Sequence, residues 1–245
     1  MNPIQIRTRD GLCPAYVYHP ATGAPWPAVL VYMDGIGIRP PVLELGERLA
    51  SGGYYVLLPD LYYRSGPYAP MDARRVFADP DSRRMLSERF MSLATSANIM
   101  SDTRAFLDYL GEQPDVRPGG IGITGYCMGG RLALIAAGTY PERIAAAASY
   151  HGARLANDAP DSPHLLAPKI RARVYVAGAI EDPSFPDEMK ELLEKALAEA
   201  GVDHVVETYP ARHGWVFRDT PVFDAQQSEH HWLTLFALLG ERLSR

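Results

Sequence analysis

The chain has 245 residues, of which 47% are hydrophobic and 22% charged, a composition typical of a globular protein with enough apolar material for a sizeable core. Its net charge of -5 offers no basic surface for nucleic acid, and no apolar stretch approaches the roughly 20 residues that span a bilayer. The only cysteines, Cys13 and Cys127, exclude a disulfide framework and a four-cysteine metal site.

Strand patterns and helix patterns alternate along most of the chain. Alternation of apolar and polar residues, or a continuous apolar run, predicts strands at 4–11, 14–20, 27–35, 54–62, 119–126, 144–152, 172–182 and 204–210. Helical spacing of apolar residues predicts helices at 41–51, 128–140, 186–201 and 223–243. It also predicts a long helix that follows an irregular stretch from 63 to about 84 and continues through 110. This order predicts an α/β fold in which a mostly parallel central sheet is flanked by helices on both faces, within a single domain spanning 1–245.

The segment "GYCMG", residues 125–129, lies between a predicted buried strand and a predicted helix. It fits the pattern G-x-nucleophile-x-G, in which small residues allow a sharp turn that exposes the central side chain. The helix that begins there favours a thiolate through its free amides and its dipole. We therefore interpret Cys127 as a nucleophile, with a buried cysteine in a tight turn as the alternative, and Cys13 as structural.

Two later positions can complete a catalytic triad. In α/β-hydrolases the nucleophile, acid and base follow one another along the chain. Asp182 ends a predicted strand and precedes a proline, and His213 follows the last predicted strand. We expect Asp182 to orient His213 and His213 to act as the base, although a helix-opening carboxylate and an exposed histidine are the plainer alternatives. His230 and His231 lie within a predicted helix, and we interpret them as surface residues.

An oxyanion requires two backbone donors near the nucleophile. The amide of Met128 is one candidate, and the amide of Gly35, or of its neighbour Ile36, in the loop after the third strand is the other. Asp34 places a carboxylate at the mouth of this site, where capping a helix is its alternative role. No metal and no cofactor is expected.

These motifs together resemble the dienelactone hydrolase family, α/β-hydrolases with a Cys-Asp-His triad. The resemblance extends over nearly the whole chain and rests on "GYCMGG", on "LLPDLYYR" after the strand at 54–62, on the position of Asp182 and on "HGWVFR" near the end. It implies that the carboxylate after the third strand, commonly glutamate in the family and Asp34 here, holds and activates the thiol. It also implies that arginines clamp a substrate carboxylate.

One clamp residue is expected at Arg218 and the other among five arginines of the irregular stretch, Arg74, Arg75, Arg83, Arg84 and Arg89. Trp215 and Tyr126 are further candidates for substrate binding. Aromatic residues are candidates for an apolar pocket, namely Tyr62, Tyr63, Tyr68, Trp215 and Phe217.

The sequence thus predicts a cytoplasmic hydrolase, because "MNPIQIRTRDG" lacks the apolar core of a signal peptide. We expect it to cleave a small ester or lactone of the dienelactone type through an acyl-enzyme on Cys127. One alternative is a general small carboxylesterase or thioesterase that does not act on dienelactones. Another is a non-catalytic ligand-binding or thiol redox-sensing protein. We expect a monomer or homodimer that binds a small molecule and neither nucleic acid nor membrane.

Overall fold

The computed structural model describes residues 1–243, and one eight-stranded sheet runs through them in the order β1-β2-β4-β3-β5-β6-β7-β8. The strands are β1 (Asn2–Thr8), β2 (Gly11–Tyr18), β3 (Ala28–Tyr32), β4 (Tyr55–Pro59), β5 (Ile121–Tyr126), β6 (Ile144–Tyr150), β7 (Arg173–Ala179) and β8 (His204–Tyr209). β1 pairs antiparallel with β2 and β2 with β4, whereas every pairing from β4 through β8 is parallel. The predicted mostly parallel sheet is confirmed.

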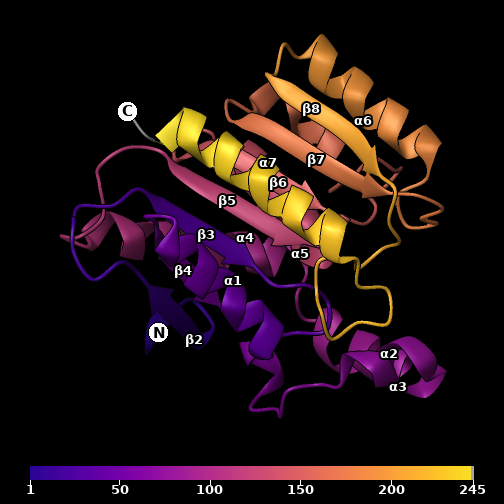
Figure 1. The fold of residues 1–245 in the computed structure, drawn as a ribbon, viewed down its shortest axis with the longest axis horizontal. Helices are drawn as coiled ribbons and strands as arrows, with labels where there is room; N and C mark the ends of the chain where they lie inside the picture. The colour runs from indigo at the N-terminus through magenta and orange to yellow at the C-terminus, as the bar shows by residue number, and fades with distance from the viewer. Residues whose placement is uncertain (244–245) are drawn as a thin grey trace.

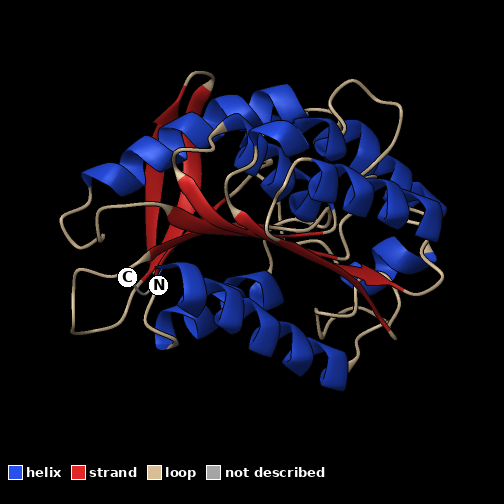
Figure 2. Ribbon diagram, turned by 90° about the horizontal axis from the view of Figure 1, so that it is seen from above, coloured by secondary structure: helices blue, strands red, loops and turns tan. Residues whose placement is uncertain are grey.

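Helices cover both faces of the sheet (Figure 2). α1 (Pro40–Ser51) and α7 (Ala225–Leu243) lie together on one face, and α4 (Ser96–Glu112) and α5 (Met128–Thr139) pack on the other. α6 (Asp187–Glu199) packs beside β8. Because both faces are covered, every residue of β3, β4 and β5 is buried, which explains why these strands read as continuous apolar runs.

The segment before α4 differs from the sequence-based prediction. The predicted long helix is interrupted, because the Thr95 side chain accepts a hydrogen bond from the amide of Asn98 at 3.2 Å and so caps a helix that begins only at Ser96. The chain before it forms α2 (Ala73–Ala78), α3 (Pro80–Leu86) and a π-helical turn (Ser87–Met91). We call residues 73–91 the cover segment.

The cover segment lies away from the sheet, next to the carboxyl ends of the parallel strands (Figure 1). Asp72 caps the start of α2 and Asp79 caps the start of α3, where Pro80 takes the first helical position. Short 3-10 turns at Tyr63–Ser65 and Pro163–Lys169 complete the regular structure. Across residues 1–243, no helix combines the length and the apolar character needed to cross a membrane.

Candidate active site

The turn between β5 and α5 holds Cys127 in a strained backbone conformation. Cys127 has φ 52° and ψ −115°, a left-handed φ that few residues other than glycine adopt. Its amide donates to the carbonyl of Tyr150 at 3.1 Å, and its own carbonyl accepts from the amides of Gly130 and Arg131 in the first turn of α5. The thiol is therefore presented at the carboxyl end of β5, at the start of a helix, by a backbone fixed on both sides.

The glycines around Cys127 are required by close approach of the backbone. A Cβ atom on Gly125 would collide with the backbone of Gly129, and one on Gly129 would collide with the carbonyl oxygens of Tyr32 and Met33 at the end of β3. The first turn of α5 thus lies directly against two strands. The pattern G-x-C-x-G is consequently a packing requirement of this turn and not an incidental composition.

Asp182 and His213 come together from the ends of neighbouring strands. His213 Nδ1 lies 2.7 Å from Asp182 Oδ2, although the two residues are 31 positions apart. Ser184 donates from its amide and its hydroxyl to Asp182 Oδ1, at 2.9 and 2.6 Å, and its Oγ lies 3.3 Å from His213 Nδ1. Ser184, which the sequence did not single out, therefore fixes the carboxylate that orients the imidazole.

The electrostatics of this pair favour a charged imidazole. Burial, the largest single effect, lowers the pKa of His213, but the negative charge of Cys127 and the hydrogen bond to Asp182 outweigh it and raise the pKa to about 10. Burial also raises the pKa of Asp182, yet its hydrogen bond with His213 leaves that pKa below the usual value. At neutral pH the favoured arrangement is an imidazolium between a carboxylate and the Cys127 sulfur.

The loop after β3 supplies a backbone donor beside the thiol. The amide of Ile36 donates to Asp34 Oδ1 at 3.0 Å and is therefore not free to bind another acceptor. The amides of Gly35 and Met128 have no backbone or side-chain acceptor among residues 1–243. Tyr62 donates its hydroxyl to the Gly35 carbonyl at 2.6 Å, which fixes that peptide next to Met128. Two uncommitted amides flanking a nucleophile can bind an oxyanion.

Asp34 has a different partner from the one that the family resemblance implies. Its two oxygens accept a bidentate pair from Arg39, at 2.7 and 2.9 Å, and Arg39 Nε donates to Asp219 at 2.6 Å. Arg39 is 1% exposed; burial lowers its pKa, but the two carboxylates outweigh this and raise it. Asp34 lies at the mouth of the site as expected, but its carboxylate is held by Arg39 instead of holding the Cys127 thiol.

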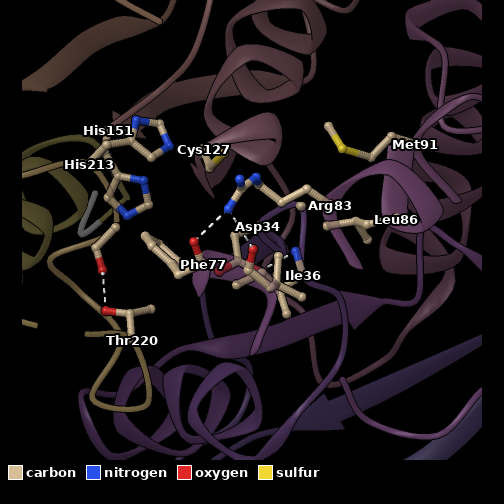
Figure 3. Close-up of a pocket in the computed structure, with 13 residues that line it drawn as sticks. Asp34, Ile36, Phe77, Arg83, Leu86, Met91, Cys127, His151, His213 and Thr220 are labelled. Carbon is tan, nitrogen blue, oxygen red and sulfur yellow. Dashed lines mark hydrogen bonds between the residues drawn. The ribbon is translucent and has the colours of Figure 1, made fainter. Parts of the chain in front are cut away.

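Cys127 and His213 line a cavity of about 430 Å³ (Figure 3). Its other lining is mostly apolar and comes from the loop after β3 and from the cover segment: Ile36, Val76, Phe77, Leu86 and Met91. Arg83 is the only arginine or lysine that lines it within residues 1–243. Its Nη1 donates to the carbonyls of Val76 and Phe77, which leaves its other N–H groups available.

His151, at the end of β6, also lines this cavity. The sequence analysis gave it no role, although a histidine at the carboxyl end of a buried parallel strand was a usable signal. Its ring centroid lies 5.1 Å from that of His213 (Figure 3). Burial, followed by the charge of His213, holds its pKa well below the usual value, so the ring is neutral.

Three residues expected to bind substrate lie elsewhere. Arg218 pairs with Glu44 on the surface. Trp215 is fully buried behind His151, and Tyr126 is fully buried with its hydroxyl 2.9 Å from His231 Nε2. None of the three lines the cavity. The expectation that His231 is a surface residue was wrong, since it is 0% exposed, whereas His230 is exposed.

The other aromatic residues proposed for the pocket, Tyr62, Tyr63, Tyr68 and Phe217, are likewise absent from its lining. Tyr62 and Phe217 are buried in the core. Tyr63 and Tyr68 border a separate surface hollow near Asp60. The apolar wall of the cavity comes instead from the cover segment and Ile36.

Comparison with known proteins gives a consistent result. A family model described as "Dienelactone hydrolase family" matches residues 13–243. A Synechocystis protein named "Putative carboxymethylenebutenolidase" is 28% identical over 228 residues, which cover 89% of this chain and 87% of that protein. An Escherichia coli K12 protein of the same name is also 28% identical over 228 residues, covering 89% of this chain and 79% of its own length.

Solved structures agree with this result at the level of the fold. A structure titled "Putative Dienelactone Hydrolase" from Klebsiella pneumoniae superposes with a TM-score of 0.84 at 22% identity, covering 98% of this chain and 97% of that one. The metagenomic "Dienelactone Hydrolase-like Promiscuous Phospotriesterase P91" superposes with a TM-score of 0.76 at 24% identity, covering 98% of both chains.

Proposed function

Since the chain belongs to the dienelactone hydrolase family and is a hydrolase, we propose that it cleaves a small carboxylic ester or lactone through a covalent acyl-enzyme on Cys127. The observation that carries this proposal is the arrangement of Cys127, His213 and the Asp182–His213 hydrogen bond at one edge of the sheet, facing a cavity. A ligand-binding protein without catalysis would not require this arrangement or a strained elbow.

The proposed reaction begins from a Cys127 thiolate and a protonated His213. The thiolate attacks the ester carbonyl, and the amides of Gly35 and Met128 bind the oxyanion that forms. As the tetrahedral intermediate collapses, His213 gives its proton to the leaving oxygen, or to the ring oxygen of a lactone. Asp182 holds the imidazole in the orientation that both proton transfers require.

Water then completes the reaction. The oxygen of a water molecule bonds to the acyl carbon while neutral His213 accepts one of its protons. The carbon–sulfur bond breaks, the carboxylic acid leaves, and Cys127 returns to the thiolate beside a protonated His213. A thiolate leaves readily, so a tetrahedral intermediate with a poor leaving oxygen would expel Cys127 and return to the substrate. Esters and lactones whose leaving oxygen forms a stable anion are therefore the favoured substrates.

Two substrate classes fit the cavity to different degrees. The lining by Ile36, Phe77 and Met91 favours an uncharged ester with a small apolar group. A dienelactone, the substrate for which the family is named, carries a carboxylate. Among residues 1–243, Arg83 is the only cationic side chain at this cavity that could pair with it. Arg83 supports the lactone and the apolar wall supports the general carboxylesterase.

The test compares wild type with Cys127→Ala on p-nitrophenyl acetate and a cis-dienelactone. We expect the variant to lose both activities by at least about 10³-fold, while Cys13→Ala, which removes a buried thiol of the β1–β2 hairpin, keeps them. Arg83→Met separates the substrates: a dienelactone enzyme loses about 10- to 100-fold on the lactone only. An active Cys127→Ala variant would refute the proposed nucleophile.

A further inference from the structure

His151 is a buried histidine whose hydrogen-bonding capacity is unused. His151 is 1% exposed, and neither Nδ1 nor Nε2 has a hydrogen-bond partner among residues 1–243. Whichever tautomer is present, a neutral imidazole contains one donor and one acceptor, so both groups are left without a protein partner. An unpartnered buried polar group destabilises the folded state, so its presence beside the cavity calls for a functional explanation.

The other buried histidine, His231, shows that burial of a histidine in this core does not by itself leave the ring without partners. His231 is fully buried in α7, yet its Nε2 lies 2.9 Å from the Tyr126 hydroxyl and its Nδ1 lies 3.2 Å from the Ser228 carbonyl. The core thus satisfies one histidine completely and leaves the other, which lines the cavity, without a partner.

The backbone and the packing hold the His151 ring in one place. His151 has φ 40°, a second left-handed residue at the same edge of the sheet as Cys127. Its amide donates to the Ala177 carbonyl at 2.8 Å, and its ring packs edge to face against Trp215, with 4.9 Å between centroids. A residue with a strained backbone and a fixed side chain that has no hydrogen-bond partner is typical of a functional position.

The other polar side chains that line the cavity are already engaged in or assigned to other roles. The Asp34 carboxylate is held by Arg39, and the Thr220 hydroxyl donates to the carbonyls of Gly214 and Phe217. Arg83 lies in the cover segment and donates to backbone carbonyls there. His151 lies next to the proposed nucleophile and base, and neither of its ring nitrogens has a hydrogen bond to residues 1–243.

We propose that His151 is a second catalytic histidine, which binds the water molecule that hydrolyses the acyl-enzyme. The proposal rests on the proposed function, because it assigns the water of that reaction a binding group. With His213 neutral after acylation, the water makes one hydrogen bond to His213, which accepts that proton during attack, and a second hydrogen bond to the acceptor nitrogen of His151, which does not take the proton. Its oxygen lone pair is then free to attack the acyl carbon on Cys127, and the products are those given above.

A neutral ring at this position suits the role. A protonated His151 would have no acceptor for the water and would repel the His213 imidazolium. Burial and the neighbouring His213 and His231 lower the pKa of His151, and Arg39 acts in the same direction. The ring consequently remains an acceptor throughout the pH range in which His213 changes between its two forms.

The test measures acylation and deacylation separately under single-turnover conditions with enzyme in excess over p-nitrophenyl acetate. Nitrophenol release reports acylation of Cys127, and acid quenching followed by intact-protein mass spectrometry reports loss of the acetyl group. For His151→Phe, which keeps an aromatic ring and removes both nitrogens, we expect deacylation to slow about 100-fold and acylation to change less than about threefold. Acetyl-enzyme should accumulate in this variant.

Two further variants separate a catalytic from a structural role. His151→Gln, whose amide can still accept from water, should restore deacylation to within about tenfold of wild type. His230→Phe, on the exposed face of α7, should behave as wild type in both steps. Thermal unfolding checks that each variant is folded, and His151→Gly, which tolerates a positive φ and carries no acceptor side chain, replaces His151→Phe if the latter does not fold.

The outcomes distinguish this inference from the proposed function. Equal slowing of both steps, or unchanged deacylation in His151→Phe, would overturn the role of His151 and leave the Cys127 mechanism intact. If wild type forms no acyl-enzyme on Cys127 and the Cys127→Ala variant is equally active, the proposed function itself fails.

Discussion

The two walls of the cavity are built in different ways. One wall, the strand-end wall, consists of Cys127, His151 and His213 together with Asp182, which does not line the cavity but is hydrogen-bonded to His213. Each of these residues follows the carboxyl end of a buried or half-buried strand. The other wall is the cover segment, made of short capped helices that lie away from the sheet (Figure 1). The polar groups of the proposed mechanism lie at the ends of sheet strands, where the backbone is held on both sides, whereas the apolar lining of the cavity lies on a separate, more easily altered segment.

The largest expected effect on activity comes from a substitution in the strand-end wall. Asp182→Asn removes the carboxylate that orients His213, and we expect kcat/KM for p-nitrophenyl acetate to fall about 10²- to 10⁴-fold. A raised pKa means that His213 is protonated below about pH 10 and loses its proton above it. The alkaline limb of the wild-type profile should therefore lie near pH 10, and in the variant it should move to lower pH.

This prediction is checked by a pH profile with spontaneous hydrolysis subtracted at each pH. The stability that the folded state gains from protonated His213 is fully present below the unfolded pKa of about 6.5 and is lost as pH rises through about 10. An alkaline limb that stays in place in Asp182→Asn would contradict the coupling between the two residues.

A smaller effect, on selectivity between esters, is expected from a substitution in the cover segment. Met91→Gln keeps the length of the side chain but places an amide in the apolar lining. We expect kcat/KM for p-nitrophenyl butyrate to fall about tenfold relative to that for the acetate, because the two extra methylenes lose an apolar contact. Met85→Gln, on the exposed side of α3, is the matched control. Equal losses on both esters would mean that Met91 supports the fold and not selectivity.

The smallest effect concerns Arg218, which lies in neither wall. Its pair with Glu44 is exposed, so Arg218→Ala should change the free energy of unfolding by no more than about 0.5 kcal/mol. Turnover of the dienelactone and of p-nitrophenyl acetate should each stay within about twofold of wild type. A selective loss on the lactone would show instead that Arg218 reaches the substrate in solution.

The sequence predicted the strand-end wall better than the cover segment. The position of Cys127 follows from local patterns: glycines that a turn requires, a buried strand before it and a helix after it. Asp182 and His213 follow from chain order, because parallel strands bring their carboxyl ends to one edge. The same rule applies to His151, which directly follows β6, but the chain order of nucleophile, acid and base assigns it no role.

Long-range pairing and short helices account for the remaining differences. Arg39 and Asp219 are 180 positions apart, and no local pattern indicates that a buried arginine joins Asp34 to that loop. In the cover segment the capping residues Asp72 and Asp79 were readable signals, but helices of six and seven residues show too few turns for a clear apolar period. The interruption at Thr95 is another capping signal, which the apolar stripe through 110 concealed.

The buried link from Asp34 through Arg39 to Asp219 has a consequence for the order in which reactivity develops during synthesis of the chain. Asp34 and Arg39 leave the ribosome early, whereas Asp219 and His213 emerge close to the end. Until that last portion docks, Arg39 lacks its Asp219 partner and Cys127 lacks the neighbouring His213 imidazole. The proposed site can therefore assemble only after nearly the whole chain has been synthesised.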